Sequence, residues 1–159
     1  TKNAAQARAE VARLLKLREA ATGYWAGQIE IQSEVVRGLA TIAEGKTDEG
    51  IEILRQAAVR EDATEKHVVT PGPLLPAREV LANALLDAGK PADALREYET
   101  VLTKEPNRLR ATGGAGLAAE RSGDKQRARL HYTKVLELTA NADSPRPEAI
   151  NAKKFLGRG

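Results

Sequence analysis

Apolar residues along the chain follow the spacing of amphipathic helices, and the pattern is clearest between residues 75 and 108. Two apolar stripes occur there, each with members one and three to four positions apart, as is typical of helices that bury one face. The first stripe consists of Val80, Leu81, Ala84 and Leu85, and the second of Ala94, Leu95, Tyr98, Val101 and Leu102. The pattern predicts a pair of short helices, neither of which can bury its apolar face alone.

Glycine and proline mark the ends of this predicted helix pair. Gly89 ends the first helix, because glycine adopts the left-handed conformation that a helix C-terminus often requires. Pro91 suits the first turn of the second helix, where its missing N–H group is not needed, and Pro106 prevents that helix from continuing. The stretch therefore predicts a helical hairpin with a tight turn at residues 88–90.

The same pattern returns at a fixed interval of 34 residues. The residues that recur in this way are Gly89, Ala94, Tyr98 and Leu102, which become Gly123, Ala128, Tyr132 and Leu136. A constant period of this length predicts a helical solenoid, in which each repeat buries the apolar face of its neighbour. Upstream, Gly45 takes the place of Gly89 at an offset of 44 residues, so a further ten residues separate the first two copies.

Small residues recur where two helices must approach closely. One column contains Gly38, Ala82 and Gly116, and another contains Gly50, Ala94 and Ala128. With these columns the chain resembles the tetratricopeptide repeat family, whose pattern has small residues at the eighth and twentieth positions, an aromatic at the twenty-fourth and proline at the thirty-second. The residues that match in the middle copy are Ala82, Ala94, Tyr98 and Pro106. Leu54 replaces the aromatic in the first copy, and Ala140 replaces the proline in the last.

The resemblance covers residues 31 to about 141 and implies an all-α fold. It implies a right-handed α-solenoid of antiparallel helix pairs, with about three repeats between an N-terminal helix and a C-terminal capping helix. The predicted parts of this single domain are an N-terminal helix or half repeat (1–23), repeat 1 (24–60), a proline-containing insert (61–74), repeat 2 (75–108), repeat 3 (109–141) and a capping helix (144–156). An ordinary antiparallel bundle with accidental spacing is the alternative.

Further hypotheses concern the start of the last helix and the start of repeat 1. Ser144 suits the N-cap of the last helix and Pro145 its first position. Near the start of repeat 1, Tyr24 and Trp25 either pack against the N-terminal helix or contact a ligand through their rings. The N-terminal helix itself is either the second helix of an upstream repeat or a cap.

The insert is the least repeat-like stretch, because its prolines exclude a helix across its second half. Loops of this length in compact domains are often functional. His67, with Glu65 and Asp62 nearby, resembles a partial metal site, but a single imidazole at loop spacing is weak evidence for one. We therefore expect the insert to brace the joint between two repeats, and an enzyme site at His67 and Glu65 is the least favoured alternative.

Composition excludes several classes of function. The chain has no cysteine, which excludes disulfides, cysteine nucleophiles and thiolate metal sites, and no apolar run long enough to span a membrane. We expect a soluble chain, in the cytoplasm or in the periplasm or outside the cell after signal removal. The start at Thr1 and the absence of methionine predict a processed chain or a piece of a longer protein. The insert, with Glu-Lys-His at 65–67 and Thr-Pro-Gly-Pro at 70–73, resembles a stretch found in bacterial repeat proteins. A net charge of +3 and few aromatics argue against nucleic acid as a partner.

Catalytic motifs are missing from the sequence, so we expect neither an enzyme nor a cofactor or metal. Residues 112–116 (Thr-Gly-Gly-Ala-Gly) have the glycines of a nucleotide loop but lack its lysine and its preceding strand. They are better explained as positions where helices pack closely.

The resemblance implies that first helices line an inner groove, and it places Gly113 among the groove positions. The groove residues that we select for a peptide site are Glu79, Asn83, Leu86, Asp87, Arg110, Leu117 and Arg121. Asn83 would pair with the backbone of an extended peptide, and the charged residues would contact its side chains. Alternatively, Asp87 and Arg121 simply pair with each other across the stack.

The favoured function is therefore a non-catalytic scaffold that binds a protein or peptide in the concave groove. The alternative is a homo-oligomerisation or assembly module of a larger bacterial protein, without a separate ligand.

Overall fold

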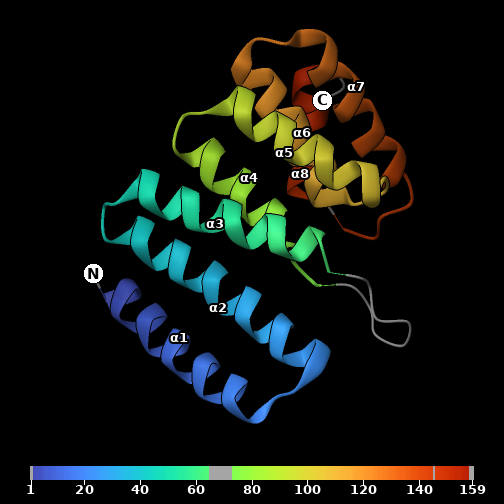
Figure 1. Ribbon diagram of the computed structural model, residues 1–159. Helices are drawn as coiled ribbons and strands as arrows, with labels where there is room; N and C mark the ends of the chain where they lie inside the picture. The colour runs from blue at the N-terminus through green and yellow to red at the C-terminus, as the bar shows by residue number, and fades with distance from the viewer. Residues whose placement is uncertain (1, 65–72, 145, 158–159) are drawn as a thin grey trace. The chain divides into compact units, whose positions relative to one another are not determined.

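The computed structural model describes residues 2–64, 73–144 and 146–157, and in these ranges the chain forms eight α-helices and no β-strand (Figure 1). The helices are α1 (Lys2–Ala20), α2 (Gly23–Ala43), α3 (Thr47–Asp62), α4 (Ala77–Asp87), α5 (Pro91–Lys104), α6 (Leu109–Ser122), α7 (Lys125–Leu138) and α8 (Pro147–Leu156). The all-α class is confirmed, and the right-handed sense of the solenoid stays a prediction.

The chain divides into two compact units, residues 1–81 and 82–159, and the boundary falls within α4. The single domain expected from the sequence stays a prediction. Each unit is described separately below.

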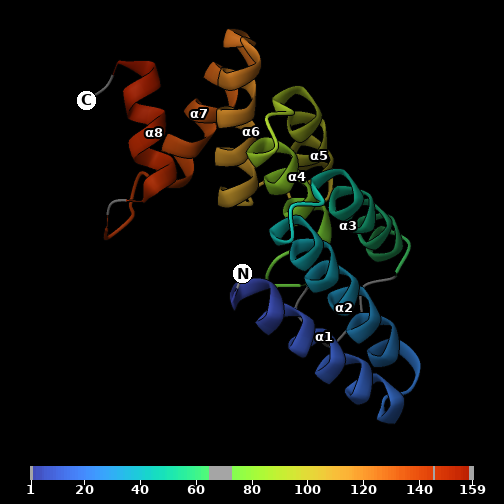
Figure 2. The ribbon, with the colours of Figure 1, turned by 90° about the vertical axis from the view of Figure 1, so that its left-hand side faces the viewer.

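In the first unit, α1 packs against α2 and α2 packs against α3, so that the three helices lie side by side (Figures 1 and 2). The hairpin of α2 and α3 closes through two opposed glycines. A β-carbon on Gly50 would lie 2.6 Å from the carbonyl oxygen of Gly38, and one on Gly38 would lie 2.8 Å from Cγ of Leu54. The prediction that small residues allow these helices to approach closely is therefore confirmed for this hairpin.

The end of α3 and the start of α4 are joined by two side chains of α3. Oε2 of Glu61 accepts a hydrogen bond from the backbone N–H of Ala77 at 2.6 Å, and Oδ2 of Asp62 accepts one from Nε of Arg78 at 2.7 Å. Glu61 thereby satisfies one of the N–H groups that the first turn of a helix leaves without a partner. The hypotheses on His67 and Glu65 of the insert concern residues outside the described ranges.

In the second unit, α6 contacts α5, α7 and α8, and α7 also contacts α8 (Figure 2). Glycines of α6 make these contacts close. The ring of Tyr98 from α5 occupies the place where a side chain at Gly114 would begin, and Cδ1 of Tyr132 from α7 lies 2.7 Å from the place of a β-carbon at Gly116. The interpretation of residues 112–116 as close-packing positions is confirmed.

The last helix continues the 34-residue register, a feature that the sequence analysis missed. Gly89, Gly123 and Gly157 follow α4, α6 and α8 and have φ angles of 73°, 83° and 67°. These left-handed conformations favour glycine and end each helix in the same way. Thus α8, expected only as a cap, stands in the register of a first helix.

The expected start of α8 at Ser144 and Pro145 is wrong. The helix begins at Pro147, and its N-cap is Arg146, which has an extended backbone with φ −99° and ψ 138°. A residue that precedes proline is disfavoured in the helical region, because the proline ring clashes with its backbone. Pro147 therefore excludes Arg146 from the helix and sets its start. The sequence analysis expected an earlier start because Ser144 is a favourable N-cap residue.

Candidate protein-binding surface

A buried tyrosine orients an exposed amide on α4. Tyr98 of α5 is 1% exposed, and its hydroxyl donates a hydrogen bond of 2.5 Å to Oδ1 of the exposed Asn83. Because Oδ1 accepts this bond, the N–H groups of the Asn83 amide point away from the hydroxyl. Within the described residues these N–H groups have no hydrogen-bond partner. The arrangement presents two donors in a fixed orientation at the surface.

A second buried tyrosine orients an exposed acidic side chain on α6. The hydroxyl of Tyr132 donates a hydrogen bond of 2.7 Å to Oε2 of the exposed Glu120. Burial raises the pKa of Tyr132, and the hydrogen bond to Glu120 raises this pKa further, so the hydroxyl remains protonated. Tyr98 and Tyr132 belong to the aromatic column of the repeat, and each holds an exposed polar side chain in place.

Asn83 lies close to α6, because the ring of Tyr98 that ends in its hydroxyl packs on Gly114. Arg110, Leu117 and Arg121 share the face of α6 that carries Gly114, since they lie four, three and seven positions from it. Arg110 and Arg121 are exposed and form no ion pair in the described part of the chain, and Leu117 is half-buried. The exposed residues of α4 and α6 therefore combine an oriented amide with two available guanidinium groups.

The remaining residues predicted for the site differ in their exposure. Asp87 is exposed, whereas Leu86 is 7% exposed and Glu79, which belongs to the first unit, is 1% exposed. Asp87 and Arg121, the pair offered as the alternative to a groove, do not form an ion pair with each other in the described ranges. The accessible part of the predicted site in the second unit is therefore Asn83, Asp87, Arg110, Leu117 and Arg121, which we name the α4–α6 surface.

The last helix limits this surface on one side. A β-carbon on Gly113, one of the groove positions implied by the repeat pattern, would lie 2.7 Å from Cγ of Glu148 of α8. Oε2 of Glu148 is buried and has no hydrogen-bond partner within the described residues. Sequence analysis missed this contact, although the register offered a signal, since Glu148 stands 34 positions after Gly114.

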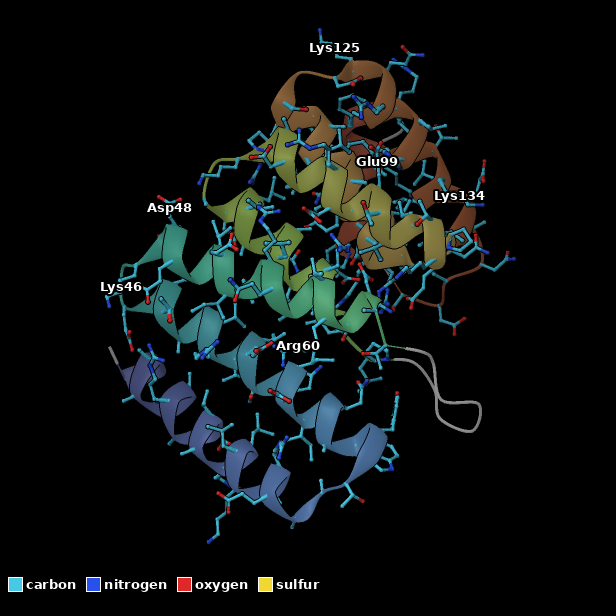
Figure 3. All side chains as sticks on the ribbon, viewed as in Figure 1. Lys46, Asp48, Arg60, Glu99, Lys125 and Lys134 are labelled. Carbon is cyan, nitrogen blue, oxygen red and sulfur yellow. The ribbon has the colours of Figure 1, made fainter. Side chains whose placement is uncertain are left out.

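The outer side of α5 and α7 holds a network of charges. Glu99, labelled on α5 in Figure 3, lies 3.2 Å from Nη1 of Arg127 and 3.3 Å from Nε2 of His131. Asp124 caps α7 by accepting the backbone N–H of Arg127, which lowers the pKa of Asp124. The part of the chain that the structure describes holds no group of three histidine, aspartate or glutamate residues arranged to bind a metal.

The hypothesis on Tyr24 and Trp25 concerns the start of α2. Trp25 is 54% exposed, and its ring meets that of Tyr24 edge-on at a centroid distance of 5.3 Å.

In the described ranges, none of the helices combines the length and the apolar character needed to cross a membrane.

Part of the chain matches the sequence model of a known repeat. The sequence model of the tetratricopeptide repeat matches residues 80–145, which include most of α4 and all of α5, α6 and α7. A comparison with curated proteins found no match. Repeats of this family generally mediate contacts between proteins and are typically not catalytic.

Proposed function

We propose that the chain is a non-catalytic scaffold that binds a protein partner through the α4–α6 surface, because residues 80–145 match the sequence model of the tetratricopeptide repeat. The partner would contribute an extended peptide segment, whose backbone offers carbonyl oxygens at regular intervals. Such a segment needs donors that are already in place, because each side chain immobilised on binding costs about 0.5–1.5 kcal/mol.

The hydrogen bond between Tyr98 and Asn83 is the observation that supports this proposal most strongly. It fixes the amide of Asn83 before any partner binds, so that its N–H groups are ready to donate to a peptide carbonyl. Arg110 and Arg121 would select acidic side chains of the peptide, and Asp87 a basic one. Leu86, being buried, would support the surface from inside, and the buried Glu79 of the first unit would not contact the partner.

Capture of partners from the source organism tests the proposal. The variant Asn83→Ala/Arg121→Gln removes one oriented amide and one available cation. Asn83→Ala also removes the acceptor of the Tyr98 hydroxyl, at a cost of about 1 kcal/mol, so circular dichroism must confirm that the variant is folded. The matched control is Lys125→Gln/Arg129→Gln on α7, which also changes exposed side chains of the second unit. We expect the first variant to lose partners that the control keeps. Identical sets of partners for the wild type and both variants would contradict the proposal.

Self-assembly of the chain is the second candidate function. It is favoured by exposed apolar side chains on two helices, Leu15 (47%) and Leu17 (58%) on α1 and Ile150 (56%) on α8. A second copy of the chain that covers such side chains removes them from water, which favours association. Light scattering over a range of concentrations tests this candidate, and a strictly monomeric chain would contradict it.

A further inference from the structure

Glu148 of α8 is a carboxylate that the free chain leaves without a partner. Its Oε2 atom is buried, and the side chain makes no hydrogen bond or ion pair within the described residues. Glu34 of α2 also has a buried oxygen of this kind, but its other oxygen lies 3.3 Å from Nη2 of Arg60. Because burial of a charged group without a partner costs free energy, Glu148 calls for an explanation that Glu34 does not.

The sequence of α8 explains why Glu148 has no partner in its own helix. A cation three or four positions further on would reach it, but these positions hold Asn151 and Ala152. Several other acids of the chain have a cation three positions away, and these pairs are Glu10–Arg13, Asp93–Arg96, Glu105–Arg108 and Asp124–Arg127. Glu148 is therefore an exception to a pattern that recurs along the chain.

Glu148 lies at the α4–α6 surface. Its Cγ atom lies 2.7 Å from the place of a β-carbon at Gly113 of α6. Arg110 and Leu117 are the neighbours of Gly113 on that face, three positions before it and four positions after it. Since the carboxyl carbon is one bond from Cγ, the carboxylate lies on the same stretch of α6 as these two members of the surface.

Neither of these neighbours supplies the missing donor. Arg110 is exposed and forms no ion pair in the part of the chain that the structure describes. Leu117 is half-buried, and its side chain has no polar atom. The place beside Glu148 therefore combines an acceptor that needs a donor with an apolar side chain that is partly open to water.

A basic side chain has the chemistry that this place lacks. The nitrogen of a lysine or arginine side chain supplies a donor and compensates the charge of the carboxylate, whereas a neutral amide supplies a donor alone. The methylene groups of the same side chain can cover Leu117, because long basic side chains pack their stems on apolar surfaces. One basic side chain thus satisfies both Glu148 and Leu117.

We propose that Glu148 is a specificity-determining residue of the peptide site, where it receives a lysine or arginine side chain of the partner's segment. The stem of that side chain covers Leu117. The inference rests on the proposed function, because it takes the α4–α6 surface as the place where the segment binds. It adds α8 to the helices that bind the segment, and it requires a basic residue in that segment.

Two small compounds test this place directly. Ethylguanidinium reproduces the charged end of an arginine side chain, and ethylurea has nearly the same shape without the charge. Each compound is titrated into the chain at millimolar concentrations, the range expected for a single contact. Ethylguanidinium should shift the nuclear magnetic resonance signals of the backbone amides of Leu117 and Glu148, and ethylurea should leave them unchanged.

Matched variants identify the acid that responds. Glu148→Gln should abolish the response to ethylguanidinium, whereas Glu137→Gln, at an exposed acid of α7, should keep it. The inference would be contradicted by the absence of a response to ethylguanidinium, by an equal response to ethylurea, or by a response that survives Glu148→Gln.

Stability separates this role of Glu148 from a structural one. Glu148→Gln removes a charge that has no partner in the described part of the free chain, so the midpoint of urea unfolding should stay the same or rise. A fall in the midpoint would show that Glu148 is already paired in the free chain, through Arg110 or a water molecule, and would contradict the inference.

Capture of partners separates the inference from the function on which it rests. Glu148→Gln should bind a captured partner at least about tenfold more weakly than the wild type, as expected for the loss of a close charge pair. If Asn83→Ala/Arg121→Gln loses partners that Glu148→Gln binds as tightly as the wild type does, the role of Glu148 is contradicted and the peptide site stands. If both variants keep all partners of the wild type, the inference and the proposed function are both contradicted.

Discussion

The hairpin of α2 and α3 in the first unit and that of α6 and α7 in the second close in different ways. In the first, two glycine backbones face each other, with the carbonyl oxygen of Gly38 2.6 Å from the place of a β-carbon at Gly50. In the second, the ring of Tyr132 fills the space over Gly116, and Ala128 takes the place of Gly50 in the repeat. One hairpin is closed by contact between backbones, and the other by an aromatic side chain.

The difference affects the surface as well as the core. The hydroxyl of Tyr132 reaches Glu120, and that of Tyr98 in the preceding repeat reaches Asn83. Leu54 holds the same position in the first unit and has no hydroxyl to donate. A tyrosine in this column therefore links the packing of a hairpin to the orientation of a polar group outside it. The repeats that have this tyrosine are also those that carry the α4–α6 surface.

The largest effect is expected where the two backbones meet. Gly50→Ala introduces the residue type that the second unit has at Ala128, but its β-carbon would overlap the carbonyl oxygen of Gly38, which cannot move aside without the helix. We expect the free energy of unfolding to fall by about 3 kcal/mol, as measured by urea denaturation.

Gly27→Ala is the matched control, because a β-carbon there meets no atom within 4 Å. It should raise the free energy of unfolding by up to about 1 kcal/mol through the higher helix propensity of alanine. Similar effects of Gly50→Ala and Gly27→Ala would show that the two backbones are not in contact.

The next largest loss of stability is expected on removal of the Tyr132 ring, which fills the space over Gly116. Tyr132→Leu gives the second unit the residue that the first has at Leu54, and it leaves a cavity beside Gly116 and Phe155, whose ring centroid lies 5.1 Å from that of Tyr132. We expect a loss of about 2 kcal/mol in the free energy of unfolding. Tyr132→Phe keeps the ring and should lose less. An equal loss in the free energy of unfolding for Tyr132→Leu and Tyr132→Phe would show that the ring itself does not hold the two helices apart.

A smaller effect should follow removal of one hydroxyl. Tyr98→Phe keeps the ring on Gly114 and deletes the hydrogen bond to Asn83, so we expect a loss of about 1 kcal/mol, measured by urea denaturation. In the capture experiment, this variant should bind the partner more weakly although its own position is buried. Unchanged binding would show that Tyr98 does not prepare Asn83 for a partner.

The smallest effect depends on pH and concerns the first unit. Arg8 of α1 donates to both carboxylate oxygens of Glu44, at 2.9 and 2.8 Å, and this hydrogen bonding lowers the pKa of Glu44. A carboxyl group with a lowered pKa stabilises the fold at neutral pH, and this contribution is lost as the pH falls through the lowered value. We expect acid titration to about pH 3 to destabilise the wild type more than Arg8→Gln. Arg13→Gln, which breaks an exposed pair with Glu10, serves as the control and should follow the wild type.

The sequence predicted the helices well where glycine and proline set their ends. The turn at Gly89 and its repeat at Gly123 were predicted from the pattern alone, and both have the expected positive φ. The start of α8 was wrong because two prolines, at 145 and 147, compete for the first position of one helix. The preference of one residue for the first position sets the start of a helix only where no neighbouring residue favours a different start.

The exposure of the site residues was harder to predict. Glu79, Asn83 and Asp87 lie four residues apart on one helix, yet Glu79 is buried and the other two are exposed. Helical spacing gives the direction of a side chain around the helix axis, but it does not show where a neighbouring element covers that face. For the same reason, the repeat pattern placed Gly113 in a groove, whereas Glu148 of α8 covers it.

The central claim is that Tyr98 orients the amide of Asn83 in the free chain. Nuclear magnetic resonance of the Asn83 side-chain amide in wild type and Tyr98→Phe tests it directly, through the ¹⁵N–¹H heteronuclear Overhauser effect. We predict a rigid amide in the wild type, with values close to those of the helix backbone, and a mobile one in the variant. An Asn83 amide that is equally mobile in both proteins would contradict the account.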